Sequence, residues 1–150
     1  MATLGAAIAL CAQDFKDVTD KSGRPYFEHC WYVMEGAQDD IDEVKIAFLL
    51  HDWLEDIYEG RIEEGKQKLL GTGFTHFTVN IISSMTHLPE DDYDTYIRKL
   101  STNKYARKGK LRDLRHNMDA TRLKGLRKKD FERLEKYARA YTYLAGIIDD

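Results

Sequence analysis

The stretch Ile46-Ala47-Phe48-Leu49-Leu50-His51-Asp52-Trp53-Leu54-Glu55-Asp56 joins a long apolar run to four ionisable side chains. Its apolar residues recur at helical spacing and predict a buried helix, capped by Gln38-Asp39-Asp40 and continuing to Trp53. The same periodicity continues along the chain, and alternating strand patterns are absent from the sequence. We therefore expect an all-α fold, an irregular bundle of about seven or eight helices. The other helices are expected at 3–17, 26–36, 61–70, 74–86, 91–100, 103–118 and 128–148.

The polar end of this stretch carries side chains that commonly bind metal ions. His51 and Glu55 are four residues apart, as are Asp52 and Asp56, so each pair would share one face of a helix. Three carboxylates crowded at the end of a buried helix repel one another and lose solvation, and a divalent cation would remove that conflict. The alternative is a polar helix end with a hydrogen-bonded histidine.

A second segment, Lys110-Leu111-Arg112-Asp113-Leu114-Arg115-His116-Asn117-Met118, has one acid in a strongly basic helix. His116 and Asn117 follow Asp113 by three and four residues and lie on roughly the same face. Asp113 either pairs with Arg112 or Arg115, or reaches inward to a metal while the basic residues face phosphate.

A third segment, Lys21-Ser22-Gly23-Arg24-Pro25-Tyr26-Phe27-Glu28-His29, begins as a turn in which Pro25 suits the start of a helix. His29 then falls about one turn into that helix, next to the large apolar residues Trp31 and Tyr32. Taken alone, such a histidine is more typical of a core or surface residue than of a ligand.

Together the three segments resemble the HD phosphohydrolases, and most closely the hydrolase domain of the RelA/SpoT family. That family has a Ser-Gly-x-Pro-Tyr-x-x-His turn, a His-Asp-x-x-Glu-Asp segment and a Lys-Leu-x-Asp-x-x-His-Asn-Met segment. Here they stand at 22–29, 51–56 and 110–118, so the resemblance spans about residues 20–120. It implies one HD-type helical domain over residues 1–150 and, given the length, a stand-alone small alarmone hydrolase.

The resemblance also implies a set of metal ligands, namely His29, His51, Asp52 and Asp113. Members of this family usually bind a single Mn²⁺ ion. Two imidazoles and two carboxylates would also accept Zn²⁺, Fe²⁺ or Co²⁺.

The remaining functional residues are likewise implied by the resemblance. Glu55 and Asp56 match the paired acids that position and activate the attacking water. Asn117 matches a residue that contacts the sugar of the nucleotide, and Lys21 matches a basic residue near the phosphates.

Four residues at three places in the chain depart from the family pattern. Cys30 replaces the usual proline after the first ligand, which should alter only the start of the helix. Asp20 stands where the family commonly has an arginine near the base, so base preference is expected to be relaxed. Asp119-Ala120 replaces the usual Arg-Thr, which leaves the contacts of this turn with substrate open.

The resemblance implies hydrolysis of the 3′-diphosphate of ppGpp, pppGpp or ppApp, with release of pyrophosphate. The alternative within the same fold is an HD-type 5′-nucleotidase or another nucleotide phosphohydrolase. A third alternative, from another class, is a non-catalytic module that binds RNA or a protein through its basic segment. The paired acids Glu55 and Asp56 argue against it, because a pure binder needs no water-activating group. Such a hydrolase can act as a homeostatic enzyme or as an antidote. In either role it can be functionally paired with an alarmone synthetase.

Charge is distributed unevenly along the chain. Twelve acids and two basic residues lie between Glu28 and Glu64, whereas thirteen basic residues and two acids lie between Arg98 and Lys129. This pattern is that of solvated helix faces or of an acidic cation site beside a basic phosphate site. The net charge of −3 argues against nucleic acid as the ligand.

Cysteine usage and the N-terminal residues bear on the cellular compartment. Cys11 and Cys30 are too few for a disulfide scaffold, and Cys30 is expected to be a buried free thiol. The apolar stretch at 4–12 is short and has no basic residue before it, so it is neither a signal peptide nor a membrane span. These features indicate the cytoplasm and no membrane partner.

Overall fold

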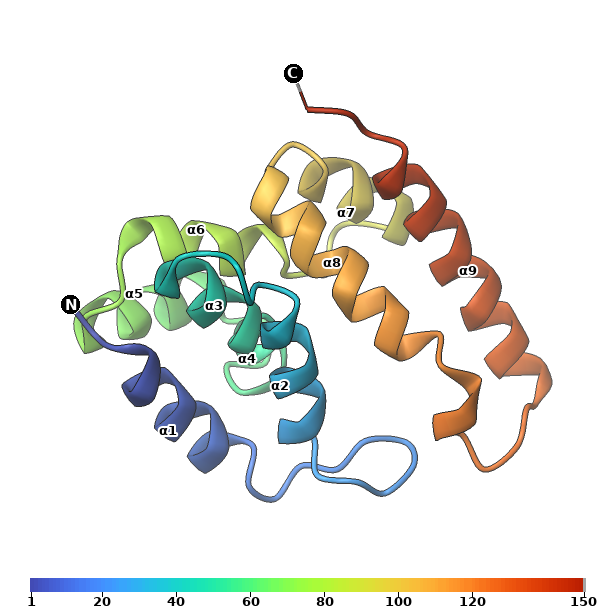
Figure 1. The fold of residues 1–150 in the computed structure, drawn as a ribbon, viewed down its shortest axis with the longest axis horizontal. Coiled ribbons are helices and arrows are strands. Elements are labelled where there is room, and N and C mark those ends of the chain that lie inside the picture. Colours follow the sequence, from blue (N-terminus) through green and yellow to red (C-terminus); the bar gives the residue numbers. More distant parts are fainter. Residues whose placement is uncertain (150) are drawn as a thin grey trace.

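The structure is a computed structural model that describes residues 1–149. Those residues form helices joined by turns, and their only β-type pairing is an isolated antiparallel bridge between Thr19 and Pro25 (Figure 1). The helices are α1 (Leu4–Asp14), α2 (Phe27–Glu35), α3 (Asp42–Leu49), α4 (Trp53–Asp56), α5 (Ile62–Thr72), α6 (His76–Ser84), α7 (Tyr93–Leu100), α8 (Lys104–Asn117), the 3₁₀ turn η1 (Ala120–Arg122) and α9 (Lys128–Ala145).

The all-α prediction is confirmed. Within the described residues, eight α-helices have eight residues or more, and the ninth, α4, is a single turn of four. Most predicted helix ends differ from the observed ones by no more than three residues. The turn η1, which follows α8, was not predicted from the sequence.

The predicted helix that continues to Trp53 is wrong in two respects. Helix α3 ends at Leu49, and the backbone at Leu50 (φ −96°, ψ 14°) and Asp52 (φ −97°, ψ 1°) leaves the helical region before α4 begins. The residue that caps α3 is Ile41, without a side-chain hydrogen bond, so Gln38-Asp39-Asp40 do not cap it. The first turn of α3 carries Asp42 and Glu43, whose negative charges interact favourably with the helix dipole.

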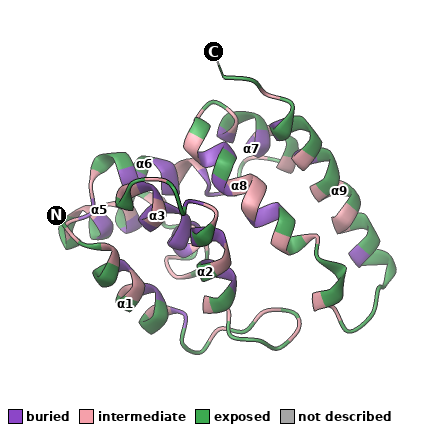
Figure 2. Cartoon of the chain, in the orientation of Figure 1, coloured by how far each residue is buried: buried purple, intermediate pink, exposed green. Residues whose placement is uncertain are grey.

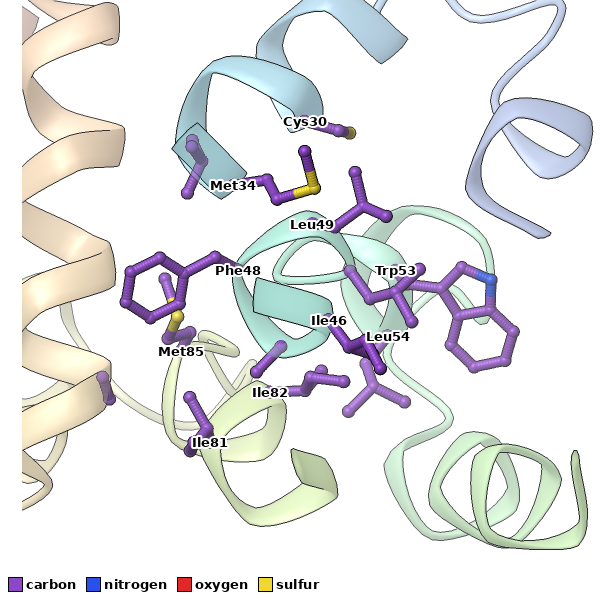
Figure 3. Packing of buried hydrophobic residues seen from close by; sticks show 14 of the residues in the cluster. Cys30, Met34, Ile46, Phe48, Leu49, Trp53, Leu54, Ile81, Ile82 and Met85 are labelled. Atoms are coloured by element: carbon purple, nitrogen blue, oxygen red, sulfur yellow. The ribbon is translucent and has the colours of Figure 1, made fainter. Parts of the chain in front are cut away.

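Helix α3 lies in the middle of the core and packs against α1, α2 and α6. Figure 3 shows Phe48 and Leu49 projecting from α3 in different directions, the first beside Met85 and the second below Met34. Both α3 side chains are completely buried, and burial of each such side chain contributes roughly 2 kcal/mol. Cys11 and Cys30 are buried free thiols in the same core, as expected for Cys30.

Helix α8 crosses the core at a glycine. A Cβ atom at Gly109 would lie 2.8 Å from Met85 Cε and 2.9 Å from Phe48 Cε1, so a larger residue would push α8 outward. Helix α8 packs between α2 and α9 (Figure 1), and its residue Asp113 is buried.

Helix α9 covers α7 and α8 and has a largely exposed outer face (Figure 2). The buried residues of α9 include Ala140 and Leu144, which lie one turn apart on the inner face of the helix. Across residues 1–149, no helix has the length and apolar character needed to cross a membrane.

Candidate metal centre and nucleotide cleft

Four side chains from three parts of the fold converge on one point. His29 comes from α2, His51 and Asp52 from the turn between α3 and α4, and Asp113 from α8, and each offers one ligand atom. These atoms lie within 4.8 Å of one another. The structure thus brings together all four residues that the resemblance implied as metal ligands.

The Nε2 atoms of both imidazole rings are directed toward the centre of this cluster. His29 Nε2 lies 2.9 Å from Asp113 Oδ1, and His51 Nε2 lies 3.0 Å from Asp52 Oδ2. Despite these distances, neither Nε2 atom makes a well-directed hydrogen bond, and both are buried. Unpaired buried polar atoms are rare because their desolvation is costly. A divalent ion bound between two imidazoles and two carboxylates would pair both atoms, so the residues fit a transition metal.

Hydrogen bonds from outside the cluster orient its members. His51 Nδ1 lies 2.8 Å from the carbonyl oxygen of Phe48 and donates to it, which leaves the lone pair of its other ring nitrogen free for a ligand. The hydroxyl of Tyr26 donates to Asp52 Oδ2 at 2.5 Å, and the Tyr26 ring stacks on Phe15. The turn between α3 and α4 is therefore held from both sides.

Asp113 has its own charged partner. Lys110 Nζ lies 2.8 Å from Asp113 Oδ2, and the Asn117 amide donates to Asp113 Oδ1 at 3.0 Å. The sequence offered pairing with Arg112 or Arg115 as one alternative, and the structure instead shows Asp113 facing inward with Lys110 as its partner.

Charge in the cluster is balanced by protons when no cation is present. Although burial alone would raise the pKa of Asp113, the neighbouring Lys110 ammonium holds it well below its usual value. Although burial alone would lower the pKa of His51, the carboxylates of Asp52 and Asp113 raise it well above its usual value. A proton on His51 and a metal ion at the cluster therefore compete for the same negative charge.

The two candidate catalytic acids lie beside the cluster. Burial, followed by the charge of Asp52, raises the pKa of Glu55 to about 7 and that of Asp56 to about 6. The backbone N–H of His87 donates to the Glu55 carboxylate. Asp56 lines a cleft that also contains His29, and Glu55 and Asp56 together line a second groove on the His87 side. Carboxyl groups with pKa values near neutrality are suited to accept a proton from water.

A cleft of about 480 Å³ opens beside the cluster, and a volume of this size suits a small-molecule ligand. Its lining mixes three cationic side chains, from Lys21, Arg122 and Arg133, with four aspartates, Asp20, Asp56, Asp119 and Asp130. Burial together with the charge of Arg133 lowers the pKa of Lys21. The predicted substrate-binding residues Lys21 and Asn117 both reach it. The lining side chains include Lys21, His29, Asp56, Asn117, Asp119, Arg122, Arg133 and Tyr137.

Asp20 has a role that the sequence did not predict. One of its oxygens accepts hydrogen bonds from the backbone N–H groups of Ser22 and Arg24 at 2.9 and 3.0 Å. The other oxygen of Asp20 lies 2.9 Å from Nη2 of Arg122. The Nη1 atom of Arg122 in turn donates to the carbonyl oxygen of His116 at 2.7 Å. Asp20 is therefore engaged within the protein, and through it Arg122 is held at the cleft. Because 102 positions separate the pair, no local sequence signal reveals it.

Other orienting groups were also missed. Tyr26, Lys110 and His116 all lie inside the recognised segments, so the segments contained the signal without revealing each partner. The carbonyl of Phe48 has no sequence signal, since every residue carries one.

The helical fold is similar to that of a protein of known structure related to SpoT, which confirms the resemblance at the level of the fold. The chain is similar to the solved structure of a metazoan ortholog of SpoT, with a TM-score of 0.74 and 19% sequence identity. The match covers 97% of this chain and 87% of that one. The metazoan protein hydrolyzes ppGpp and plays a role in starvation responses. No protein-family model matches the chain, and no curated protein matches it significantly in sequence.

Proposed function

We propose that this chain is a metal-dependent phosphohydrolase that removes the 3′-diphosphate from ppGpp, pppGpp or ppApp and releases pyrophosphate. The observation that carries the proposal is the position of the four-residue cluster beside a cleft whose lining contains His29 of the cluster, the candidate catalytic acid Asp56 and three cationic side chains. The similarity of the fold to that of a ppGpp-hydrolysing protein supports the choice of substrate class.

The ligands of the proposed metal are His29, His51, Asp52 and Asp113, with Mn²⁺ the expected ion. When bound, a divalent ion supplies a Lewis acid that lowers the pKa of water and withdraws charge from a phosphoryl oxygen.

The paired acids perform the proton chemistry in this proposal. Glu55 and Asp56, with pKa values of about 7 and 6, orient the attacking water and accept its proton near neutral pH. Attack at phosphorus breaks the bond to the 3′ oxygen of the ribose. Pyrophosphate leaves, and a nucleoside with its 5′-diphosphate or triphosphate remains.

The cleft binds and orients the nucleotide. Lys21, Arg122 and Arg133 line it and are the groups proposed to bind the two phosphate chains, whereas a nucleoside monophosphate would present only one. Arg122 and Arg133 are also ion-paired with Asp20 and Asp130, which fixes their positions in the cleft. Asn117 is within the same lining and is proposed to contact the sugar. Asp20 offers no free carboxylate edge to a base, so we expect weak discrimination between guanine and adenine.

Product analysis with a nucleotide panel tests the proposal. The Mn²⁺-loaded protein should convert ppGpp to GDP and ppApp to ADP, each with one equivalent of pyrophosphate. AMP and GMP are the comparison substrates. Release of inorganic phosphate from them, with neither alarmone cleaved, would instead assign the chain to the 5′-nucleotidase alternative and leave the metal chemistry intact.

A further inference from the structure

His116 is not among the four cluster residues, yet it touches one of them. Its Nδ1 lies 2.7 Å from Nδ1 of His29, and the two rings are nearly parallel, with an interplanar angle of 6°. At this separation one nitrogen must carry the hydrogen and the other must accept it. The contact therefore fixes a tautomer of both rings.

The direction of this hydrogen bond follows from the surroundings of each ring. His29 aims Nε2 at the buried cluster, where a ligand requires a lone pair, so its single hydrogen belongs on Nδ1. His116 Nδ1 lies 2.7 Å from that nitrogen and is then the acceptor, so the hydrogen of the His116 ring lies on Nε2.

The ring of His116 is itself held in place. It stacks on Tyr32 with a centroid separation of 4.1 Å and an interplanar angle of 14°. The Arg112 guanidinium lies 3.5 Å from the centroid of the same tyrosine ring, and Arg112 Nε donates to the Tyr32 carbonyl at 2.8 Å. The position of Arg112 is constrained in turn, because a Cβ at Gly36 would come within 2.7 Å of its side chain.

We propose that His116 is a positioning residue that holds His29 as the Nδ1–H tautomer and thereby sets the metal affinity of the cluster. The inference rests on the proposed metal-dependent function. Partners of this kind usually are carboxylates or backbone carbonyls. Here a neutral imidazole takes that place, so the ligand is oriented without further negative charge in a cluster that already holds two carboxylates.

Two variants of nearly equal shape isolate the acceptor. In His116→Asn the amide oxygen can occupy the position of Nδ1, whereas in His116→Leu a methyl group occupies it. Both variants lose the stacking ring and keep a similar shape, so the comparison between them reports chiefly on the hydrogen-bond acceptor. Arg115→Gln, at an exposed neighbouring position, is the control for changes to the surface of α8.

Metal affinity is measured by competition with a chromophoric chelator, using Zn²⁺ and Mn²⁺. We expect the leucine variant to bind each metal about 10- to 100-fold more weakly than the wild type, the usual scale for loss of such a partner. The asparagine variant should recover most of that loss, and the Arg115 control should bind like the wild type. Equal affinities of the two His116 variants, with a wild type that binds metal, would overturn this inference and leave the proposed function standing.

A direct readout of the tautomers does not depend on the variants. In two-bond ¹H–¹⁵N correlation spectra of the Zn²⁺-loaded wild type, His29 should appear as the Nδ1–H form and His116 as the Nε2–H form. A hydrogen on His116 Nδ1 would overturn the inference. If the wild type binds neither metal, the proposed function fails, and this inference fails with it.

Discussion

At the scale of single residues, Glu55 carries the clearest conflict between folding and chemistry. Its carboxyl group is half-buried beside Asp52, and its main stabilising contact is the N–H of His87. A carboxyl group with a raised pKa is useful to a hydrolase near neutral pH, and it destabilises the fold wherever it must ionise without a compensating charge.

Removal of either paired acid should separate binding from turnover. Glu55→Gln and Asp56→Asn keep the shape of the side chain and remove a proton acceptor, so turnover should fall by about 10²–10⁴-fold. Metal content, measured by atomic emission after dialysis, should stay close to that of the wild type. A variant that instead loses its metal would identify that acid as a ligand.

The same substitution should stabilise the metal-free protein at alkaline pH. Because the pKa of Glu55 is about 7 in the folded state against an ordinary value of 4.5, the folded protein binds more protons between these values. The free energy of unfolding therefore falls as the pH rises through that window. At pH 8 and in EDTA, the free energy of unfolding of Glu55→Gln should exceed that of the wild type by about 1–3 kcal/mol. Near pH 4 the difference should be close to zero. Urea titrations followed by tryptophan fluorescence give both values, and a variant less stable at pH 8 would contradict the assignment.

At the scale of elements, the turn at 19–25 and η1 form two sides of the cleft and are tied together by Asp20 and Arg122. This ion pair is only partly exposed, and hydrogen bonds from the turn backbone help to lower the pKa of Asp20 to about 2 against the opposing effect of burial. The pair therefore persists at any pH at which the protein would be assayed.

Asp20→Ala should loosen this part of the cleft without affecting the metal cluster. We expect KM for the nucleotide to rise about 10-fold or more, because the turn that carries Lys21 loses its anchor and Arg122 loses its partner. Metal affinity should be unchanged. Asp39→Ala, at an exposed position between α2 and α3, is the matched control and should behave like the wild type. An unchanged KM for Asp20→Ala would show that the ion pair does not shape the nucleotide site.

At the scale of the whole molecule, metal binding should stabilise the fold, because its ligands come from α2, the α3–α4 turn and α8. At a free metal concentration 100 times Kd, binding adds about 2.7 kcal/mol to the free energy of unfolding. Thermal unfolding monitored by circular dichroism should therefore show a higher Tm with Mn²⁺ than with EDTA. Asp52→Ala should abolish both this shift and hydrolysis, and a metal-dependent shift that persists in this variant would place the ion elsewhere.

Much of this architecture was predictable because helical periodicity and short segments are local properties. A single residue was not enough to predict a metal ligand. His29 alone resembled a core histidine, and only its combination with segments far along the chain indicated a ligand. The break between α3 and α4 was not predictable. Leu50 and Asp52 carry no strong helix-breaking signal, and contacts from Tyr26 and the Phe48 carbonyl accompany the observed turn.

That break has a consequence for protein engineering. A continuous helix through residues 50–52 would turn His51 and Asp52 about 100° apart around its axis and would engage the Phe48 carbonyl with a backbone N–H. Substitutions that favour a continuous helix across this break would then make the backbone more regular while dispersing the ligands. Design methods that reward regular backbone would select such variants, and selection for thermal tolerance alone would do the same. Directed evolution of this chain should therefore screen for metal retention together with heat resistance.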